Sequence, residues 1–399
     1  MTPEPDPKMV LPAPAQAMEK LRPTSFEVAT CAILGYDTQP LRFEPSDPDP
    51  MKALEKALLP ALTRPPCVVA FSGGRDSSAL LATAMDLARR EGLPQPIALT
   101  RRWPAYPETD EDNWQELVIR HLGVSQWERV DFEDNDVIGA AFRPTLQRHG
   151  VLWPPLVHSW PPLFAKARGG AMVTGEGGDE VFGPRRCTWL RRLLWTRPRA
   201  TKAVAIGAGV AVAPRSVRRR MELQQIRHDL DSPWLRPAVR EHYFTLYADE
   251  LVQEPFSWAP SLRWHLGRRF VSVGIQTLRL LAAESGTELF CPLLDSGFVA
   301  SLASLAGPLG FPGRTRGMTA LFGNLLPAEL LSRPTKAYTT SALAGQASKD
   351  FAEGWAGDGL DGSLVDPAEL QRTWASGKVP SRTAMLLQQA WLGTAGRAR

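Results

Sequence analysis

A short apolar run that leads through a glycine turn into an amphipathic helix constrains the fold of this chain most. Residues 67–71 read Cys-Val-Val-Ala-Phe, and such a continuous apolar run is typical of a strand covered on both faces. Residues 77–90 follow with apolar side chains at helical spacing, and Gly92 ends that pattern. We therefore expect a strand, a tight turn and a helix.

This unit recurs along the first half of the chain. Residues 51–62 have helical spacing and precede two prolines. Further helices are expected at 110–122 and 158–168, and further strands at 97–100, 127–132 and 171–174. Alternating strands and helices predict an α/β fold with a parallel, doubly wound, Rossmann-like sheet. From residue 184 onward, helical patterns such as 263–284 and 383–391 predict a mainly helical region with no strand series.

The length of 399 residues favours two domains. We divide the chain into a proline-rich segment at 1–50, an α/β core at 51–183 and a helical region at 184–399. The first segment is expected to be flexible, except for a docking segment at about 26–41. The helical region would complete the domain that the α/β core begins and line its pocket. The apolar stretch 203–214 falls short of the roughly 20 residues that span a bilayer, and we expect a buried helix there.

Composition sets weak limits on partners and compartment. The formal net charge of +4 does not by itself require nucleic acid as a partner. The N-terminus lacks the basic start and apolar run of a signal peptide. Cys31, Cys67, Cys187 and Cys291 are widely spaced and form no Cys-x-x-Cys pair, so we expect reduced, mostly buried thiols. A cytoplasmic protein with neither a membrane nor a nucleic-acid partner is expected.

The turn after the first strand has the features of an anion site. It reads Ser72-Gly73-Gly74-Arg75-Asp76-Ser77-Ser78. Glycines let backbone N–H groups approach a phosphate closely, and a helix N-terminus adds a favourable dipole. The absence of a Gly-Lys-Ser/Thr ending argues against a loop for a transferable γ-phosphate. The alternative is a serine- and glycine-rich turn that binds nothing.

A second glycine-rich, acidic loop follows another apolar strand. Residues 174–183 read Thr-Gly-Glu-Gly-Gly-Asp-Glu-Val-Phe-Gly. Loops at the carboxyl ends of parallel strands can face each other across one crevice. Two carboxylates from separate loops can hold Mg²⁺ between them, while phosphate oxygens complete its coordination. Taken alone, such a loop is equally well interpreted as a solvated turn.

These loops carry a resemblance to a known family. The first resembles the pyrophosphate loop of N-type ATP pyrophosphatases, and the second resembles a motif of the asparagine synthetase family's synthetase domain. β-Lactam synthetases and lasso-peptide cyclases belong to that group. Residues 288–295 look like the family's Pro-Phe-Leu-Asp segment, and residues 326–336 look like its late arginine-to-lysine segment. The resemblance covers roughly residues 65–340, and its last two segments are supportive rather than specific.

The resemblance implies an adenylating ligase that uses ATP and Mg²⁺. A substrate carboxylate would attack ATP and release pyrophosphate, and an amine or ammonia would then displace AMP. Asp76 and Asp179 would hold the metal, Glu176 would orient or deprotonate the amine, and Lys336 would stabilise charge on the α-phosphate. Asp295 is better interpreted as a helix cap than as a catalytic group. The nucleotide-binding residues that the resemblance implies are Ala70, Phe71, Ser72, Gly73, Gly74, Asp76, Ser77, Leu99, Thr100 and Gly175.

Differences from the family's sequence pattern limit the sources of nitrogen that the reaction could use. Glutamine-using members begin with a catalytic cysteine after the initiator methionine, whereas Thr2 stands here, and the segment before Cys67 is too short for a glutaminase domain. We therefore expect ammonia, a separate amidotransferase or peptide-pathway partner, or an amine on the substrate to supply nitrogen. Two product classes stay open, an open amide and a peptide macrolactam or other natural-product amide, although a lasso-peptide cyclase normally retains an extra N-terminal domain. β-Lactam synthetases carry tyrosine where this chain has Glu176, which favours the asparagine synthetase pattern.

A basic tract at 185–227 stays open to two interpretations: a solvated helical face, or a mobile cover that attracts ATP or an acidic peptide. Two other functions also remain. An RNA-modifying adenylating enzyme would share the first loop but should carry an RNA-binding appendage or catalytic cysteine pair, and neither is visible. A non-catalytic scaffold is disfavoured by the presence of both magnesium aspartates. The tract comprises Arg185, Arg186, Arg191, Arg192, Arg197, Arg199, Lys202, Arg215, Arg218, Arg219 and Arg220, with Glu222 as the neighbouring acid.

Overall fold

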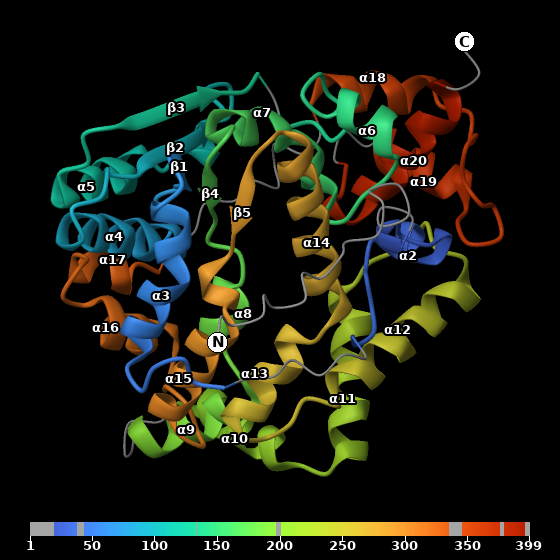
Figure 1. Cartoon of the computed structure of the whole chain (residues 1–399). Helices are drawn as coiled ribbons and strands as arrows, with labels where there is room; N and C mark the ends of the chain where they lie inside the picture. Colours follow the sequence, from blue (N-terminus) through green and yellow to red (C-terminus); the bar gives the residue numbers. More distant parts are fainter. Residues whose placement is uncertain are drawn as a thin grey trace, which may run out of the picture.

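A computed structural model of the chain describes residues 20–37, 44–133, 135–196, 201–334, 345–375 and 379–395. At its centre lies one parallel sheet of order β3-β2-β1-β4-β5, with helices on both faces (Figure 1). Alternate residues of each strand enter different apolar clusters: Val69 packs under α3 and α4, whereas Val68 packs towards α7 and α14. The doubly wound α/β fold with a mainly helical C-terminal region is confirmed.

The order of the strands sets the position of the cleft. β1 pairs with β2 on one side and with β4 on the other, and Val69 lies opposite both Ala98 and Val173. The strand order therefore reverses beside β1, and ligands of open α/β sheets bind in the crevice at such a switch point. The strands are β1 Cys67–Ala70, β2 Ile97–Arg102, β3 Trp127–Asp131, β4 Ala171–Val173 and β5 Glu288–Phe290.

β5 is a single strand in the region after residue 184, where we expected helices and no strand series. This strand lies beyond α14 in the sequence and pairs with β4, with Phe290 opposite Val173. Three residues are too few to show the alternation by which strands are recognised. Pairing with β4, rather than a local pattern, therefore defines this strand.

Most helices of the first half agree with the sequence patterns, with one exception. α3 Pro50–Leu62, α4 Arg75–Arg90 and α5 Asp112–Leu122 form where helices were expected. α4 begins two residues early, which brings Asp76 into its first turn. The single helix expected at 158–168 is wrong. The chain instead forms η2 Pro155–Ser159, α7 Pro161–Phe164 and η3 Ala165–Ala167, because proline fits a helix only in its first turn.

In the described part of the second half, β5 is the one strand and the other elements are helices. The long helix expected at 263–284 is two helices, α13 Trp258–Leu266 and α14 Arg269–Glu284, with Gly267 and Arg268 between them. The remaining helices of the chain are α2 Ser25–Thr30, η1 Pro107–Thr109, α6 Arg143–His149, α8 Gly178–Phe182, α9 Arg186–Thr196, α10 Lys202–Val212, α11 Arg215–Asp229, α12 Pro237–Leu251, η4 Pro292–Leu294, α15 Ser296–Ala306, α16 Arg314–Phe322, α17 Ala328–Ser332, α18 Gln346–Gly354, α19 Pro367–Ala375, η6 Ser381–Thr383 and α20 Ala384–Ala395.

Residues 25–37 dock on the helical half. A capping box between Thr24 and Glu27 starts α2. Glu27 then accepts a hydrogen bond of 2.7 Å from Arg269 at the start of α14. The backbone N–H of Gly35 donates to Glu250 of α12 at 2.6 Å. Residues 1–19 and 38–43 of the predicted N-terminal segment lie outside the described residues.

α10 is not the buried helix that its composition suggested. Of its residues, Ala208 and Ala211 are buried, whereas Ile206 is 54% exposed and Val212 is 59% exposed. Small residues let one side of α10 approach α9 closely: a Cβ on Gly207 would lie 2.5 Å from the Trp189 ring. Within the part of the chain that the structure describes, no helix is both long and apolar enough to cross a membrane.

Candidate active site

A cleft of about 470 Å³ opens at the carboxyl ends of β1, β2 and β4. Both glycine-rich loops border it, and so do residues from α16 and from the segment after α17. The sequence-predicted residues that line the cleft are Ala70, Phe71, Ser72, Gly74, Asp76, Ser77, Leu99, Gly175, Glu176 and Asp179.

The loop after β1 is held in shape by its own hydroxyl groups. Ser77 Oγ accepts a hydrogen bond from the Ser72 backbone N–H at 3.2 Å and donates to the Gly74 carbonyl at 3.1 Å. Gly73 has a φ of +79°, and a Cβ there would lie 2.8 Å from the Gln115 side chain. Gln115 in turn donates to the Ser72 carbonyl at 3.2 Å. The side chains of Ser77 and Gln115 therefore fix the conformation of this loop.

The loop after β4 fits tightly against the first loop. A Cβ on Gly178 would lie 2.4 Å from Asp76 Cγ, so the backbone of one loop contacts the carboxylate of the other. Gly177 has a φ of +90°, and a Cβ there would lie 2.3 Å from the Leu294 side chain. Both glycines are needed for close approach, and Gly177 is also needed for the turn.

Asp76 and Asp179 meet at the guanidinium of Arg314. Arg314 Nη1 donates to Asp179 Oδ1 at 2.6 Å, and Nη2 donates to Asp76. Burial lowers the pKa of Arg314, but the two carboxylates more than offset this and leave its pKa above the ordinary value. The two aspartates predicted to act together thus lie within reach of one guanidinium group.

The donor set suits Mg²⁺ with a polyphosphate. Across the described ranges, no cluster holds three or more His, Cys, Asp or Glu side chains able to bind a metal. Two carboxylates would therefore supply the protein ligands, and phosphate oxygens and water would complete the octahedron that Mg²⁺ requires. Asp76 and Asp179 fit such an ion, because both are carboxylates and both reach the same guanidinium group.

Three arginines surround the first loop, and sequence reasoning gave none of them a role. The Arg333 side chain is 2% exposed, bonds to Glu111 at 2.5 Å and donates to the Gly73 carbonyl at 3.1 Å. Burial lowers the pKa of Arg75, and the positive charges of Arg314 and Arg333 lower it further. Asp76 and Asp179 oppose this effect on the pKa of Arg75. Arg333 lies in the segment 326–336, which supports the family resemblance, whereas Arg314 lies in no motif that the sequence shows.

Gly73 and Thr100, two of the predicted nucleotide-binding residues, do not line the cleft. Gly73 contributes through its carbonyl, which accepts the bond from Arg333. Thr100 is fully buried and donates to the Phe71 carbonyl at 2.8 Å. It also accepts a bond from the Trp127 indole at 2.8 Å. Thr100 therefore joins β2 to its neighbours instead of facing the cleft.

Arg101 adds a cation near Leu99 that the sequence did not single out. Its guanidinium lies 4.6 Å from the Trp103 ring centre and 5.7 Å from that of Trp160. It donates to Ser159 at 2.8 Å. Burial lowers the pKa of Arg101 to about 10, so the group stays charged at neutral pH.

The remaining predicted residues have different positions. Glu176 is exposed and borders the cleft between Gly175 and Gly177. Lys336 lies outside the described residues. Asp295 caps α15, because its side chain accepts a hydrogen bond of 2.9 Å from the Phe298 backbone N–H. The interpretation of Asp295 as a cap is confirmed.

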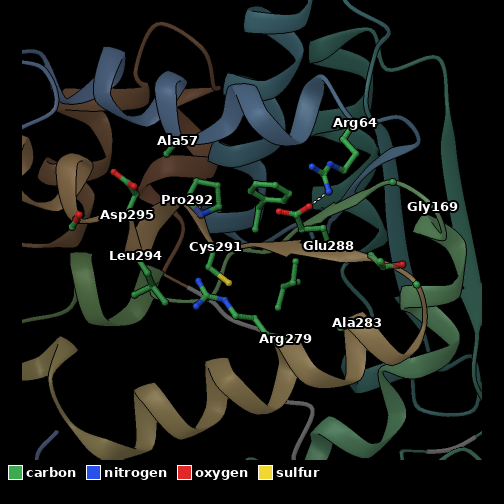
Figure 2. A pocket seen from close by; sticks show the side chains of 16 residues that line it. Ala57, Arg64, Gly169, Arg279, Ala283, Glu288, Cys291, Pro292, Leu294 and Asp295 are labelled. Carbon is green, nitrogen blue, oxygen red and sulfur yellow. Dashed lines mark hydrogen bonds and ion pairs between the residues drawn. The ribbon is translucent and has the colours of Figure 1, made fainter. Parts of the chain in front are cut away.

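A second hollow of about 770 Å³ follows the outer edge of β5, between α3 and α14 (Figure 2). An ion pair between Arg64 and Glu288 spans one end, and Arg279 and Asp295 lie towards the other. None of the described residues that line this hollow lines the cleft. Burial raises the pKa of the Cys291 thiol to about 11, so it is not a nucleophile at neutral pH.

The chain was also compared with known proteins. A sequence model of the family described as asparagine synthase matches residues 52–392. This span takes in both glycine-rich loops, β5 and α16. No curated protein matches the chain.

Proposed function

The chain belongs to the asparagine synthase family, whose members use ATP and join a carboxylate to ammonia or an amine, and we propose that it is an AMP-forming amide ligase. In the proposed reaction a substrate carboxylate attacks the α-phosphate of ATP and pyrophosphate leaves. The amine or ammonia then attacks the acyl-adenylate and AMP leaves. Mg²⁺ accompanies the nucleotide.

One observation carries this proposal. Asp76 and Asp179 come from loops about a hundred residues apart in sequence, yet one guanidinium bonds to both. Carboxylates that converge beside an anion-binding loop are suited to hold a divalent ion on a polyphosphate. The arginines around the loop add positive charge where the pyrophosphate would develop its own negative charge.

The residues of the cleft and Lys336 would have the following roles in this reaction. The backbone of residues 72–77 and the nearby guanidinium groups would bind the departing pyrophosphate. Asp76 and Asp179 would hold Mg²⁺, which neutralises phosphate charge when bound. Glu176, at the rim of the cleft, would orient the attacking amine or accept its proton. Lys336 would stabilise charge on the α-phosphate.

We propose three alternative sources of nitrogen for this reaction. Ammonia, an amine within the substrate or a separate amidotransferase would supply it, and a macrolactam or other natural-product amide is the product class we favour. The ligase would act in the cytoplasm. A peptide-pathway protein would then be the partner that presents the substrate.

Pyrophosphate release tests the proposal. Purified protein with ATP and Mg²⁺ should release pyrophosphate and AMP when a suitable carboxylate is present among pools of amino acids, small acids and linear peptides. A response to added ammonium would indicate external nitrogen, and release without it would indicate an internal amine. The Asp179→Asn variant is the control for contaminating activity. If ATP binds but no pool elicits release above this control, the ligase assignment is wrong.

A further inference from the structure

Three helices carry a surface that the proposed reaction does not use. α9, α10 and α11 lie together at the lower end of the molecule in Figure 1. In sequence, residues 184–221 contain eleven arginines and lysines and no aspartate or glutamate. Six of the ten large apolar side chains that are exposed in the described ranges also lie here: Leu194, Trp195, Ile206, Val212, Val217 and Met221. A surface that exposes both features is typical of an interaction site.

α10 is oriented against the usual rule for a surface helix. Its protein-facing side is made of small residues, with Ala208 and Ala211 buried and Gly207 against Trp189, whereas its other small residues Ala203, Ala205 and Gly209 have a solvent-exposed position. Its larger apolar residues, Ile206 and Val212, point to solvent. Between Lys202 and Arg215 there is no charged residue to cover this face. A helix that is apolar on all sides is normally enclosed, so α10 lacks a cover on its outer side.

Several basic residues of these helices make contacts within the protein, and among them Arg219 pairs with Asp249 of α12 at 2.5 Å. Arg186, Arg192 and Arg218 donate to the backbone carbonyls of Ala211, Pro312 and Val252 and fix the helices in place. Lys202, Arg215 and Arg220 are exposed and form no hydrogen bond or ion pair with another described residue. We call Lys202, Arg215, Arg220 and the six exposed apolar residues the basic-apolar face.

The positive charge and the apolar side chains of the face together indicate what kind of partner binds there. A second copy of the chain would bring like charges together, and nucleic acid would leave the aliphatic side chains uncovered. An anionic bilayer satisfies both features, because phospholipid headgroups attract the cations and the acyl boundary accepts aliphatic groups. α10 has 11 residues and is about 16 Å long, so it can lie in the interface without spanning it. Trp195 is of a type enriched at that depth.

We propose that the basic-apolar face docks the protein onto an anionic lipid surface, with α10 lying parallel to the bilayer at the headgroup boundary. This reverses the expectation that no membrane takes part. Leucine, isoleucine and valine side chains supply the apolar contact, and lysine and arginine supply attraction that salt weakens. The proposal does not depend on which reaction the cleft catalyses.

Flotation of the full chain with lipid vesicles tests this inference. Wild type should float with vesicles of equimolar phosphatidylcholine and phosphatidylglycerol and should bind vesicles of phosphatidylcholine alone much more weakly. Replacing Ile206 and Val212 together with glutamine should weaken binding about tenfold or more, since both lose apolar contact. Replacing Arg215 and Arg220 with glutamine should cost about fivefold for each charge at low salt. Both variants should retain the wild-type melting temperature, because all four side chains are exposed.

Matched control variants distinguish vesicle binding through the basic-apolar face from non-specific binding to vesicles. Leu59→Gln removes an exposed leucine from α3, and Arg120→Gln removes an exposed charge from α5, both away from the three helices in Figure 1. Neither control should change flotation. The proposal is overturned if wild type ignores the anionic vesicles, or if the paired variants bind as well as these controls. Capture by polyglutamate without flotation would overturn it in favour of an acidic peptide.

Discussion

Arg314 occupies a position where it must compete with Mg²⁺ for the same two carboxylates. The Arg314→Met variant should therefore bind Mg²⁺ about tenfold more tightly in the absence of nucleotide, because charge-assisted hydrogen bonds to Asp76 and Asp179 no longer oppose the ion. Pyrophosphate release should nevertheless fall by about a hundredfold, since one cation near the phosphates is lost. Titration calorimetry with Mg²⁺ alone measures the first effect.

The control for that experiment lies on the same helix. Arg316→Met removes a guanidinium that stacks on Trp195, 5.1 Å from its ring centre, and leaves the carboxylate pair intact. It should leave Mg²⁺ affinity unchanged. Weaker Mg²⁺ binding in Arg314→Met would show that the arginine organises the pair for the ion and does not compete with it.

Asp179 and Lys336 are the two residues whose loss should stop the reaction without harming the fold. The Asp179 side chain is 59% exposed, and Arg314, which loses this partner, keeps its bond to Asp76. Asp179→Ala and Lys336→Ala should both reduce pyrophosphate release to background. Circular dichroism melting should show no large change for either. Normal turnover in one variant would remove that residue from the proposed mechanism.

The contact between the two loops makes a sharper prediction for α8. Gly178 lies in a helix without a positive φ, so alanine would be favoured there by helix propensity. A Cβ would however lie 2.4 Å from Asp76 Cγ and must displace that carboxylate or the loop. Gly178→Ala should lower stability by about 1–3 kcal/mol and weaken Mg²⁺ binding, as measured by denaturant unfolding and calorimetry.

Gly354→Ala gives the matching control for α18, because a Cβ there would meet no atom within 4 Å. Its stability and Mg²⁺ binding should equal those of wild type. If Gly178→Ala also behaves as wild type, the two loops can separate freely, and the carboxylates are not held together by close packing.

Some of these elements were predictable from sequence, and the reasons are local. The β1 strand is a continuous apolar run and α4 has a clear apolar face, so both could be predicted, together with the loop that joins them. β5 could not be, because three residues carry no period and its partner lies more than a hundred residues earlier. The burial of α10 was misjudged because apolar composition does not reveal which side packs. Arg314 carries no motif, and its role follows from tertiary contact.

At the scale of the whole molecule, the packing of the core does not follow the predicted boundary after residue 183. Cys67 precedes that boundary and Cys187 follows it, yet both belong to one buried cluster that joins α3, α4 and α15. Cys291 lies in the cluster on the other face of the sheet. If the regions on either side of residue 183 unfolded separately, Cys67 and Cys187 would become accessible independently.

The four thiols can therefore report how the protein opens. All are free, and burial raises the pKa of Cys67 to about 12 and that of Cys187 to about 11, so native protein should resist iodoacetamide. In increasing denaturant, we expect Cys67 and Cys187 to be alkylated at the same rate, because the cluster they share must open as one unit. Mass spectrometry of the labelled peptides measures both rates. Labelling of Cys187 well before Cys67 would instead favour the boundary, with the helical half opening while the sheet stays folded.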